Sequence, residues 1–389
     1  MSSADIIIVG GGIAGLSAAS ALARRAKVIL LEAEEAVGYH SSGRSATMVH
    51  YALGDSLVRA LTLASRPVFE DPPPEFTDVP LGHRMAVLVH AREEEFAQLD
   101  ALQEAITPFA ELERVDEGGI LNLCPAIRTG AEGAVAGLVD GNGVRLDPHA
   151  LLQAHVRALR RSGGEIVTNA RVASLARTGS VWNVSTEKGQ SFSAPTVINA
   201  AGAWADAIAL LAGLGPMGLT PLRRTIITFD GPPGVDVSNW PFAKTVGDDL
   251  YFAPESGRLF ASPMDERPTD PCDAQPDEYD VAHAAHRVEE RTTMKVQRIH
   301  SRWAGLRTFA PDRHIVAGFD PRADGFFWLA GQGGFGLQTS PVMAQIVESL
   351  VAGTPWPLRT WCVMASVTSS ESYAAPSVSA TQCTGQEST

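Results

Sequence analysis

DIIIVGGGIAGLSAASALARRAKVILLE, residues 5–32, is the stretch of this 389-residue chain that is most informative about its fold. The unbroken β-branched run at 5–9 predicts a strand buried on both faces of a parallel sheet. A glycine-rich turn, a helix of small residues and a second apolar strand, KVILLE, follow in that order. This order of strand, GxGxxG, helix, strand and acidic residue is typical of a dinucleotide-binding βαβ unit.

The glycines of this unit have separate predicted roles. Gly10 permits a tight turn, Gly12 lets the backbone approach a pyrophosphate, and Gly15 lets the helix pack against the strand. The N-terminus of the helix favours the phosphate charge, and Glu32 can accept hydrogen bonds from a ribose diol. A glycine-rich turn in an ordinary sheet is the alternative, but it leaves Glu32 unexplained. The cofactor contacts expected from this unit are Gly10, Gly12, Ile13, Ala14, Gly15, Glu32 and Ala33.

Composition and charge argue against several classes of protein. The net charge is -13 and the basic pairs lie far apart, which argues against a nucleic-acid partner. The four cysteines are scattered without a C-x-x-C pair, so no metal site is expected. Residues 6–23 carry no charge and approach the length of a membrane span. Their central glycines and an N-terminus without positive charge argue against a membrane span or a signal peptide. Reduced thiols in a cytoplasmic protein are the simplest interpretation of the four cysteines.

Local signals predict further elements. Asp147-Pro148 is typical of a helix start, and Gly163-Gly164 of its end. Residues 165–172, EIVTNARV, are predicted as one strand, and SVWNVST with QSFSA as a hairpin. Residues 195–213 predict a strand, a turn at Gly202 and a short helix.

Three further stretches are polar or glycine-rich, and each predicts a loop or turn. The loop 38–46, GYHSSGRSA, offers hydroxyls and one cation to a diphosphate or ribityl chain, although a plain surface loop is an equal alternative. Residues 333–338, GGFGLQ, open a second helix whose positive end is expected near the cofactor. The acidic stretch 265–280, DERPTDPCDAQPDEYD, is predicted to be solvated surface.

Five segments taken together resemble a known family: VGGGIAGLSAA, LLEAEEAVGYHSSGRSA, VINAAGAWAD, WAGLRTFAPD and GFFWLAGQGGFGLQTSP. They resemble the D-amino acid oxidase/dehydrogenase superfamily of flavoproteins, which includes glycine and sarcosine oxidase-like proteins. Over essentially residues 4–352 the chain most resembles the bacterial D-arginine dehydrogenases. The resemblance implies non-covalent FAD, whereas the fingerprint alone allows NAD as well.

The resemblance and the chain order together predict a two-domain α/β (α+β) fold. A Rossmann-like FAD-binding domain is interleaved with a substrate domain built on an antiparallel sheet. The predicted FAD-binding domain comprises 1–52, 140–220 and 305–360, and the substrate-binding domain 53–139 and 221–304. Residues 361–389 are Ser/Thr/Ala-rich and are predicted to be a disordered tail.

The resemblance also implies cofactor contacts outside the βαβ unit. Arg44 and Ser45 are expected at the diphosphate and the flavin, Val172 at the adenine, and residues 331–336 along the flavin ring. The implied set is Ser41, Arg44, Ser45, Ala46, Val172, Ala201, Gly202, Trp204, Arg307, Gly331, Gly333, Gly334, Phe335, Gly336, Leu337 and Gln338.

At the substrate, the resemblance assigns the carboxylate to Arg224 and Arg307, with Tyr251 as a third donor and Gln338 completing the pocket. A bidentate guanidinium–carboxylate pair fixes orientation as well as affinity. Ordinary explanations exist for each residue. Arg307 could form a surface ion pair, Tyr251 could be a core aromatic, and Arg223 competes with Arg224 for the inward position.

The implied reaction is oxidation of a D-amino acid by hydride transfer to flavin N5. The imino acid then hydrolyses to a 2-oxo acid and ammonia. His50 is the nearest candidate base, although a loop residue is the simpler interpretation. The D-arginine dehydrogenases have a carboxylate where this chain has Ala86, and a lid tyrosine where it has Leu53. A buried cationic side chain would lack its partner there, so we expect an uncharged, hydrophobic substrate.

Three alternatives stay open. The first is oxidation of a secondary or N-methyl amine, such as sarcosine or proline, or of a 2-hydroxy acid. The second is a pyridine-nucleotide-dependent monooxygenase or disulfide reductase, against which the single fingerprint argues. The third is an inactive flavoprotein acting as a scaffold or sensor. The expected electron acceptor is a quinone or another compound, with oxygen still open, and the protein is expected to be a monomer or homodimer.

Overall fold

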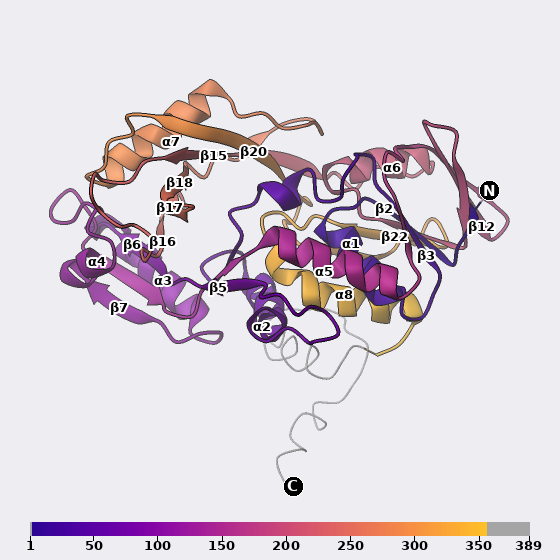
Figure 1. Cartoon of the computed structure of the whole chain (residues 1–389), viewed down its shortest axis with the longest axis horizontal. Coiled ribbons are helices and arrows are strands. Elements are labelled where there is room, and N and C mark those ends of the chain that lie inside the picture. The colour runs from indigo at the N-terminus through magenta and orange to yellow at the C-terminus, as the bar shows by residue number, and fades with distance from the viewer. Residues whose placement is uncertain (1, 356–389) are drawn as a thin grey trace, which may run out of the picture.

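The computed structural model describes residues 2–355 (Figure 1). The predicted disordered tail, 361–389, lies outside the described residues. Two extended sheets lie side by side in Figure 1, with the N-terminal βαβ unit on the right and the larger sheet on the left. Within residues 2–355, no helix is both long enough and apolar enough to cross a membrane.

A six-stranded sheet is built on the N-terminal βαβ unit. Its neighbouring strands are parallel, apart from the antiparallel pair formed by the last two. In spatial order they are β10 (Glu165–Val167), β3 (Val28–Leu31), β2 (Ile6–Val9), β14 (Thr196–Asn199), β22 (Phe326–Ala330) and β21 (Val316–Phe319). All residues of β2 and β3 are buried, as their unbroken apolar sequences predict.

Helices and a second sheet cover the two faces of this sheet. Alternate residues of β2 face opposite sides: Ile6 and Ile8 join one core cluster, Ile7 and Val9 another. On the first face lie α1 (Ile13–Leu22), α2 (Ser56–Glu70), α5 (Pro148–Arg161) and α8 (Gly336–Ala352). On the second lie α6 (Ala205–Leu211), β1 (Ser2–Ser3), β11 (Val172–Thr178), β12 (Val181–Thr186) and β13 (Ser191–Ala194). The predicted α/β class is thereby confirmed.

A nine-stranded sheet forms the other half of the molecule. Its spatial order is β19 (Arg267–Pro268), β15 (Thr220–Phe229), β18 (Arg258–Ser262), β17 (Tyr251–Glu255), β16 (Phe242–Thr245), β6 (Val87–Ala91), β8 (Ala136–Asp140) and β7 (Glu113–Asp116), with β20 (Ile299–Phe309) also pairing with β15. Its neighbours are antiparallel, except that β16 and β6 run parallel. The sheet is therefore mixed, where an antiparallel one was expected.

The remaining elements connect these sheets. They are η1 (Ser41–Arg44), β4 (Met48–Val49), β5 (Gly82–Arg84), η2 (Glu93–Glu95), α3 (Phe96–Ile106), α4 (Glu117–Leu123), β9 (Val144–Leu146), η3 (Gly202–Trp204) and α7 (Glu278–Arg291). α2 belongs to the segment 53–139 that was predicted for the substrate domain, yet it packs against α8 beside the six-stranded sheet. The two halves are thus interlocked at this helix.

Most local predictions agree with the structure, and two are wrong. α5 begins at Pro148 with Asp147 as its cap, because the Asp147 side chain accepts a hydrogen bond from Ala150 N at 2.9 Å. The β12–β13 hairpin is present as well. The single strand predicted at 165–172 is instead β10 and the start of β11, separated by a turn in which Asn169 has φ +52°.

The acidic stretch 265–280 is the second correction, because it is not simply solvated surface. The carboxylate of Asp280 is fully buried, and it pairs with Arg223 at 3.1 Å and with Arg267 at 2.8 Å. Asp265 accepts a hydrogen bond from Thr225 N at 2.8 Å. Acidic side chains in this stretch thus attach the loop and α7 to β15 and β19.

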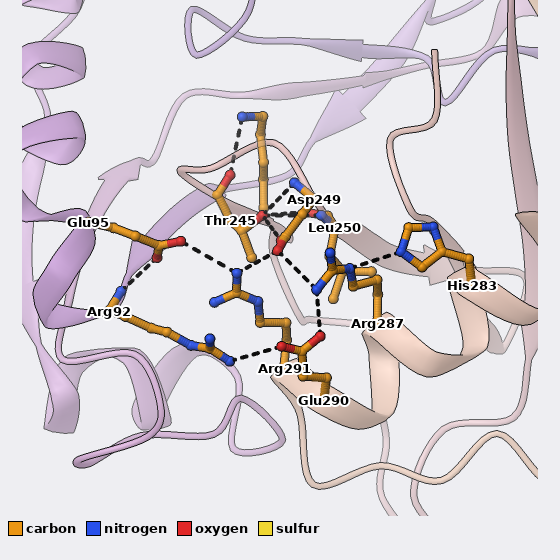
Figure 2. Close-up of polar contacts among 10 residues, drawn as sticks. Arg92, Glu95, Thr245, Asp249, Leu250, His283, Arg287, Glu290 and Arg291 are labelled. Carbon is orange, nitrogen blue, oxygen red and sulfur yellow. Dashed lines mark hydrogen bonds and ion pairs between the residues drawn. The ribbon is translucent and has the colours of Figure 1, made fainter. Parts of the chain in front are cut away.

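An ionic network ties α7 to the turn between β16 and β17 (Figure 2). Asp249 pairs with Arg291 at 2.5 Å and with Arg287 at 3.6 Å. The hydroxyl of Thr245 accepts hydrogen bonds from the N–H groups of Asp249 and Leu250, both at 3.1 Å. Tyr251 follows directly, so the network holds the backbone from which its ring extends.

Candidate cofactor and substrate site

A cavity of about 350 Å³ extends from the carboxyl ends of β2, β3 and β14 to strands β15, β17 and β20 of the larger sheet. The volume is within the range of about 300–1,000 Å³ that small-molecule and cofactor sites occupy. Its position agrees with the rule that ligands of open α/β sheets bind beyond the carboxyl ends of the strands. The cavity therefore has the place and size of a cofactor site.

The GxGxxG glycines form one end of this cavity. Gly10 has φ +111°, and a Cβ there would overlap the carbonyl oxygen of Ala200. A Cβ on Gly15 would overlap the carbonyl oxygen of Gly10. A Cβ on Gly12, in contrast, would have only the hydroxyl of Ser42 within 4 Å. The first two glycines serve the fold, and Gly12 leaves space open at the helix start, as a pyrophosphate requires.

Glu32 lines the cavity at the end of β3 and also closes the glycine turn. Its carboxylate accepts hydrogen bonds from Gly11 N at 2.6 Å and from Glu34 N at 2.8 Å. Burial raises the pKa of this carboxyl group, and the two backbone hydrogen bonds counteract that effect.

Ser42 is a site residue that the sequence reasoning missed. Its hydroxyl accepts a hydrogen bond from Ile13 N at 2.9 Å at the first turn of α1, and the residue lines the cavity. The predicted Ser41 also lines the cavity, but its hydroxyl donates to the carbonyl of Leu306 at 2.6 Å. The hydroxyl-rich loop was the available signal. The 3₁₀ turn η1 decides which serine faces the helix.

Arg44 lines the cavity while its guanidinium is bound to protein groups. It donates to the carbonyls of Ala274 at 3.0 Å and Ala304 at 3.3 Å, and it pairs with Asp273 at 2.5 Å. The guanidinium also lies 5.2 Å from the ring centre of Tyr39. Arg44 thus connects the cofactor cavity to the acidic stretch 265–280.

The structure brings most of the remaining predicted cofactor residues to the cavity. Those lining it are Gly10, Gly12, Ile13, Ala14, Ala33, Ser45, Ala46, Val172, Ala201, Gly202, Trp204, Arg307, Gly333, Gly334, Gly336 and Leu337. Those that do not line it are Gly15, Gly331, Phe335 and Gln338. Gln338 is buried between α8 and α2, where its amide donates to Thr62 at 2.9 Å.

Three predicted substrate residues meet at the other end of the cavity. Arg224, Tyr251 and Arg307 all line it. Arg224 Nη1 and the Tyr251 hydroxyl are buried and have no hydrogen-bond partner among residues 2–355. Within the same residues, the guanidinium of Arg307 forms no hydrogen bond or ion pair. Arg223 lies on the opposite face of β15, where it pairs with Asp280, so Arg224 is the inward-facing residue.

The end of the cavity formed by Arg224, Tyr251 and Arg307 carries positive charge and no acidic lining residue. Burial first, and the nearby positive charge of Arg224 second, lower the pKa of Arg307 to about 10. Glu32 and Glu34 are the only acidic residues of the described chain that line the cavity. Both lie at the end beside the GxGxxG turn, which we call the nucleotide end. Two guanidinium groups and a phenol are therefore available to an anionic ligand.

His50 does not line this cavity. It is buried and packs against Phe242 with the two rings tilted by 39° and their centres 5.4 Å apart. Burial lowers its pKa to about 3, and the charges of Lys244 and Arg307 add to this effect. His50 borders a separate cavity of about 10 Å³, room for about one water molecule, together with Asp140 and other residues.

The two positions that argued for an uncharged substrate also lie outside the main cavity. Leu53 packs against a cluster formed by Val58, Leu222, Phe309 and Phe335. Ala86 does not line the cavity either. Neither position can therefore contact a ligand in the cavity directly, and the acidic residues that line it, Glu32 and Glu34, lie at the end beside the GxGxxG turn.

Comparisons with known proteins agree with this geometry. A family model described as FAD dependent oxidoreductase, DAO, matches residues 5–350. The hydrogen cyanide synthase subunit HcnC of Pseudomonas aeruginosa is 23% identical, over 91% of this chain and 94% of that protein.

Solved structures show the same fold. Glycine oxidase from Geobacillus kaustophilus superposes with a TM-score of 0.80 at 21% identity, covering 92% of this chain and 97% of its own. The L-alpha-glycerophosphate oxidase from Mycoplasma pneumoniae, with FAD bound, has a TM-score of 0.80 at 20% identity, covering 90% and 95%. With the family model spanning nearly the whole described chain, this protein belongs to the DAO family of FAD-dependent oxidoreductases, and FAD is its cofactor.

Proposed function

We propose that this protein oxidatively deaminates a D-amino acid with an uncharged side chain, giving a 2-oxo acid and ammonia. The observation that carries the proposal is the convergence of Arg224, Arg307 and Tyr251 on one cavity, in which the buried Nη1 of Arg224 and hydroxyl of Tyr251 have no hydrogen-bond partner among residues 2–355. Buried polar groups are normally paired, so these donors require an acceptor from outside the chain. A carboxylate has the charge and the two-oxygen geometry that a guanidinium prefers.

The residues of the chain supply binding and orientation in this reaction. Bound FAD supplies the hydride acceptor. Arg224 and Arg307 hold the substrate carboxylate, and Tyr251 donates a third hydrogen bond, so the α-carbon occupies one position. The Tyr251 ring packs between Phe242 and Phe260, which fixes its hydroxyl and limits access of water.

The amine proton needs no dedicated side-chain base. His50 is neutral at physiological pH but lies outside the cavity. We propose that the substrate amine loses its proton to solvent on binding, helped by the positive charges of Arg224 and Arg307, which disfavour an ammonium group. His50 then has a structural role.

The uncharged side chain follows from the distribution of acidic residues. A cationic side chain buried near Arg224 and Arg307 would meet like charge and no carboxylate of the cavity lining. The D configuration, an electron acceptor other than oxygen, and the domain boundaries given above rest on the family resemblance and belong to this proposal.

Product analysis tests the proposal. The FAD-loaded enzyme is incubated with an artificial electron acceptor and D-Met, D-Leu or D-Phe, and ammonia and the 2-oxo acid are measured. Equal amounts of the two products support the proposal. Turnover of sarcosine or proline, or of a 2-hydroxy acid without ammonia release, would establish the alternative chemistry. Arg224, Arg307 and Tyr251, which together form the carboxylate clamp, select only for a carboxylate.

A further inference from the structure

The three nitrogens of the Arg224 guanidinium group lie in different surroundings. Nε donates to the carbonyl of Asp265 at 2.6 Å, and Nη2 pairs with the carboxylate of Glu266 at 3.3 Å. Nη1 is buried and has no partner among residues 2–355. Two of the nitrogens are thus held by the protein, and the third is left for a ligand.

Glu266 is itself held in place beside Arg224. The Asp265 carboxylate accepts hydrogen bonds from the backbone N–H and the hydroxyl of Thr225, at 2.8 and 3.1 Å. On the other side, Arg267 and Pro268 form β19, which pairs with β15 at Arg223 and Leu222. Glu266 lies between these two attachments, so its side chain is presented to Arg224 by the backbone on both sides.

The outer side of the Glu266 carboxylate faces Arg313. Nη2 of Arg313 lies 3.2 and 3.1 Å from the two carboxylate oxygens, and its guanidinium stacks 3.8 Å from the ring centre of Phe309. The Arg313 side chain is 54% exposed, whereas that of Arg224 is 5% exposed. Solvent screens the charge of Arg313 more than that of Arg224, so Glu266 acts mainly on the buried partner.

Glu266 therefore changes the net charge of the substrate clamp. Arg224, Arg307 and Arg313 carry three positive charges, and the neighbouring carboxylates of Glu266 and Asp265 compensate two of them. One uncompensated positive charge matches a single carboxylate. A doubly charged ligand would bring a second negative charge close to Glu266, without a counter-charge in the cavity.

We propose that Glu266 is a positioning and specificity residue that directs Nη1 of Arg224 into the cavity and restricts the clamp to singly charged carboxylates. This inference rests on the proposed carboxylate clamp and is independent of which amine is oxidised. Glu266 does not line the cavity, so it acts through Arg224.

Binding of two anions that lack an oxidisable amine tests the inference. FAD-loaded wild type, Glu266→Gln and Glu266→Asp are titrated with propionate and with malonate at mildly alkaline pH and constant ionic strength. The perturbed flavin absorption spectrum gives the Kd of each anion. Glu70→Gln is the matched control. The Glu70 side chain is 39% exposed, close to the 36% of Glu266, and it also pairs with an arginine, Arg66.

We expect the wild type to prefer propionate, and Glu266→Gln to shift the ratio of the two Kd values about tenfold toward malonate, as loss of one nearby charge predicts. Glu266→Asp should keep the wild-type ratio while weakening both anions, since the shorter side chain retains the charge but not the reach. Glu70→Gln should change neither Kd.

If the ratio of the two Kd values in Glu266→Gln stays within about twofold of the wild-type ratio, the change is smaller than the loss of a nearby charge requires. This result would overturn the inference while leaving the carboxylate clamp intact. If wild type binds neither anion, the clamp itself is wrong and the inference falls with it. If Glu266→Gln does not retain FAD, Arg313→Gln provides the same test in the opposite direction. It removes the outer partner of Glu266 and should shift the ratio toward propionate, and an unchanged ratio would contradict the inference.

Discussion

Arg224 and Arg307 lie diagonally across the β15–β20 pair: Arg224 is opposite Gly305, two residues before Arg307, and both arginines reach the same cavity. Diagonal neighbours on one face of an antiparallel pair are close enough for long side chains to interact. The pKa of Arg307 is lowered to about 10 because of burial first and the charge of Arg224 second. The fold thus holds two like charges together in a cavity that an anion can occupy.

Replacing Arg307 tests the role of this charge in substrate binding. Arg307→Met should lower kcat/KM for the best amino acid about 100-fold or more, because it removes a charged two-point contact. Arg307→Lys should recover only part of this loss, since a lysine offers charge without the planar fork. Steady-state kinetics measure both effects.

The same substitution should not destabilise the protein. Arg307→Met removes a partly buried positive charge that has no ion-pair partner among residues 2–355, so the Tm of the ligand-free enzyme should be unchanged or higher. A marked fall in Tm together with a change in kcat/KM below about threefold would instead assign Arg307 a structural role.

Two glycines of the GxGxxG motif should respond differently to substitution. Gly12→Val places a side chain in open space at the start of α1, so we expect a folded protein that is purified without FAD. Gly15→Ala would overlap the carbonyl of Gly10, so we expect lower stability whether or not FAD is added. Flavin absorbance and thermal unfolding of the two variants distinguish these outcomes. Normal FAD content in Gly12→Val would contradict the placement of the pyrophosphate.

Arg44 and Asp273 should have opposite effects on FAD affinity. Arg44→Gln removes a cation from the cofactor cavity, and we expect the Kd for FAD to rise about tenfold. Asp273→Asn removes the competing carboxylate at 2.5 Å, and we expect the Kd to stay equal or fall. Reconstitution of apoprotein, followed by flavin fluorescence, gives both values. An equal loss of affinity in the two variants would show that the ion pair itself, and not the free cation, is what FAD binding requires.

Buried histidines should make the protein sensitive to mild acid. Burial lowers the pKa of His155 from 6.5 to about 3, and its Nδ1 lies 2.8 Å from the hydroxyl of Ser20. Between these pH values the unfolded chain binds a proton that the folded chain does not bind. Stability is therefore retained above pH 6.5 and lost as the pH falls toward 3. His50 and His90 have the same shift, also mainly because of burial.

The expected size of this effect is about 2 kcal/mol per buried histidine between roughly pH 7 and pH 5. Urea unfolding at several pH values measures it. His155→Gln should reduce the slope of stability against pH by about one proton. An unchanged slope in His155→Gln would show that His155 is protonated in the folded state.

Where sequence reasoning succeeded, the signal was local. The β-branched run, the glycine spacing and the Asp147 cap each act within a few residues, so β2, α1 and α5 could be predicted with useful bounds. The carboxylate clamp was identified through resemblance. Because side chains alternate in direction along a strand, the sequence of β15 shows only that Arg223 and Arg224 face opposite sides of the sheet. The buried Asp280, in the first turn of α7, pairs with Arg223 and leaves Arg224 to face the cavity.

Where it did not succeed, the deciding contact came from a distant part of the chain. Residues 265–280 are acidic and polar, and only their pairing with Arg44, Arg223 and Thr225 distinguishes them from solvated surface. Gln338 was expected in the pocket, but the packing of α8 on α2 turns its amide toward Thr62.

The most direct test of the central claim is anaerobic mixing of the FAD-loaded enzyme with D- and L-amino acids, followed by the absorbance of the oxidised flavin. We expect rapid loss of this absorbance with D-Met, D-Leu or D-Phe, slow or no change with D-Arg and D-Lys, and no change with the L enantiomers. Reduction chiefly by D-Arg or D-Lys would contradict the uncharged substrate. Reduction by none of the amino acids would contradict the proposed function itself.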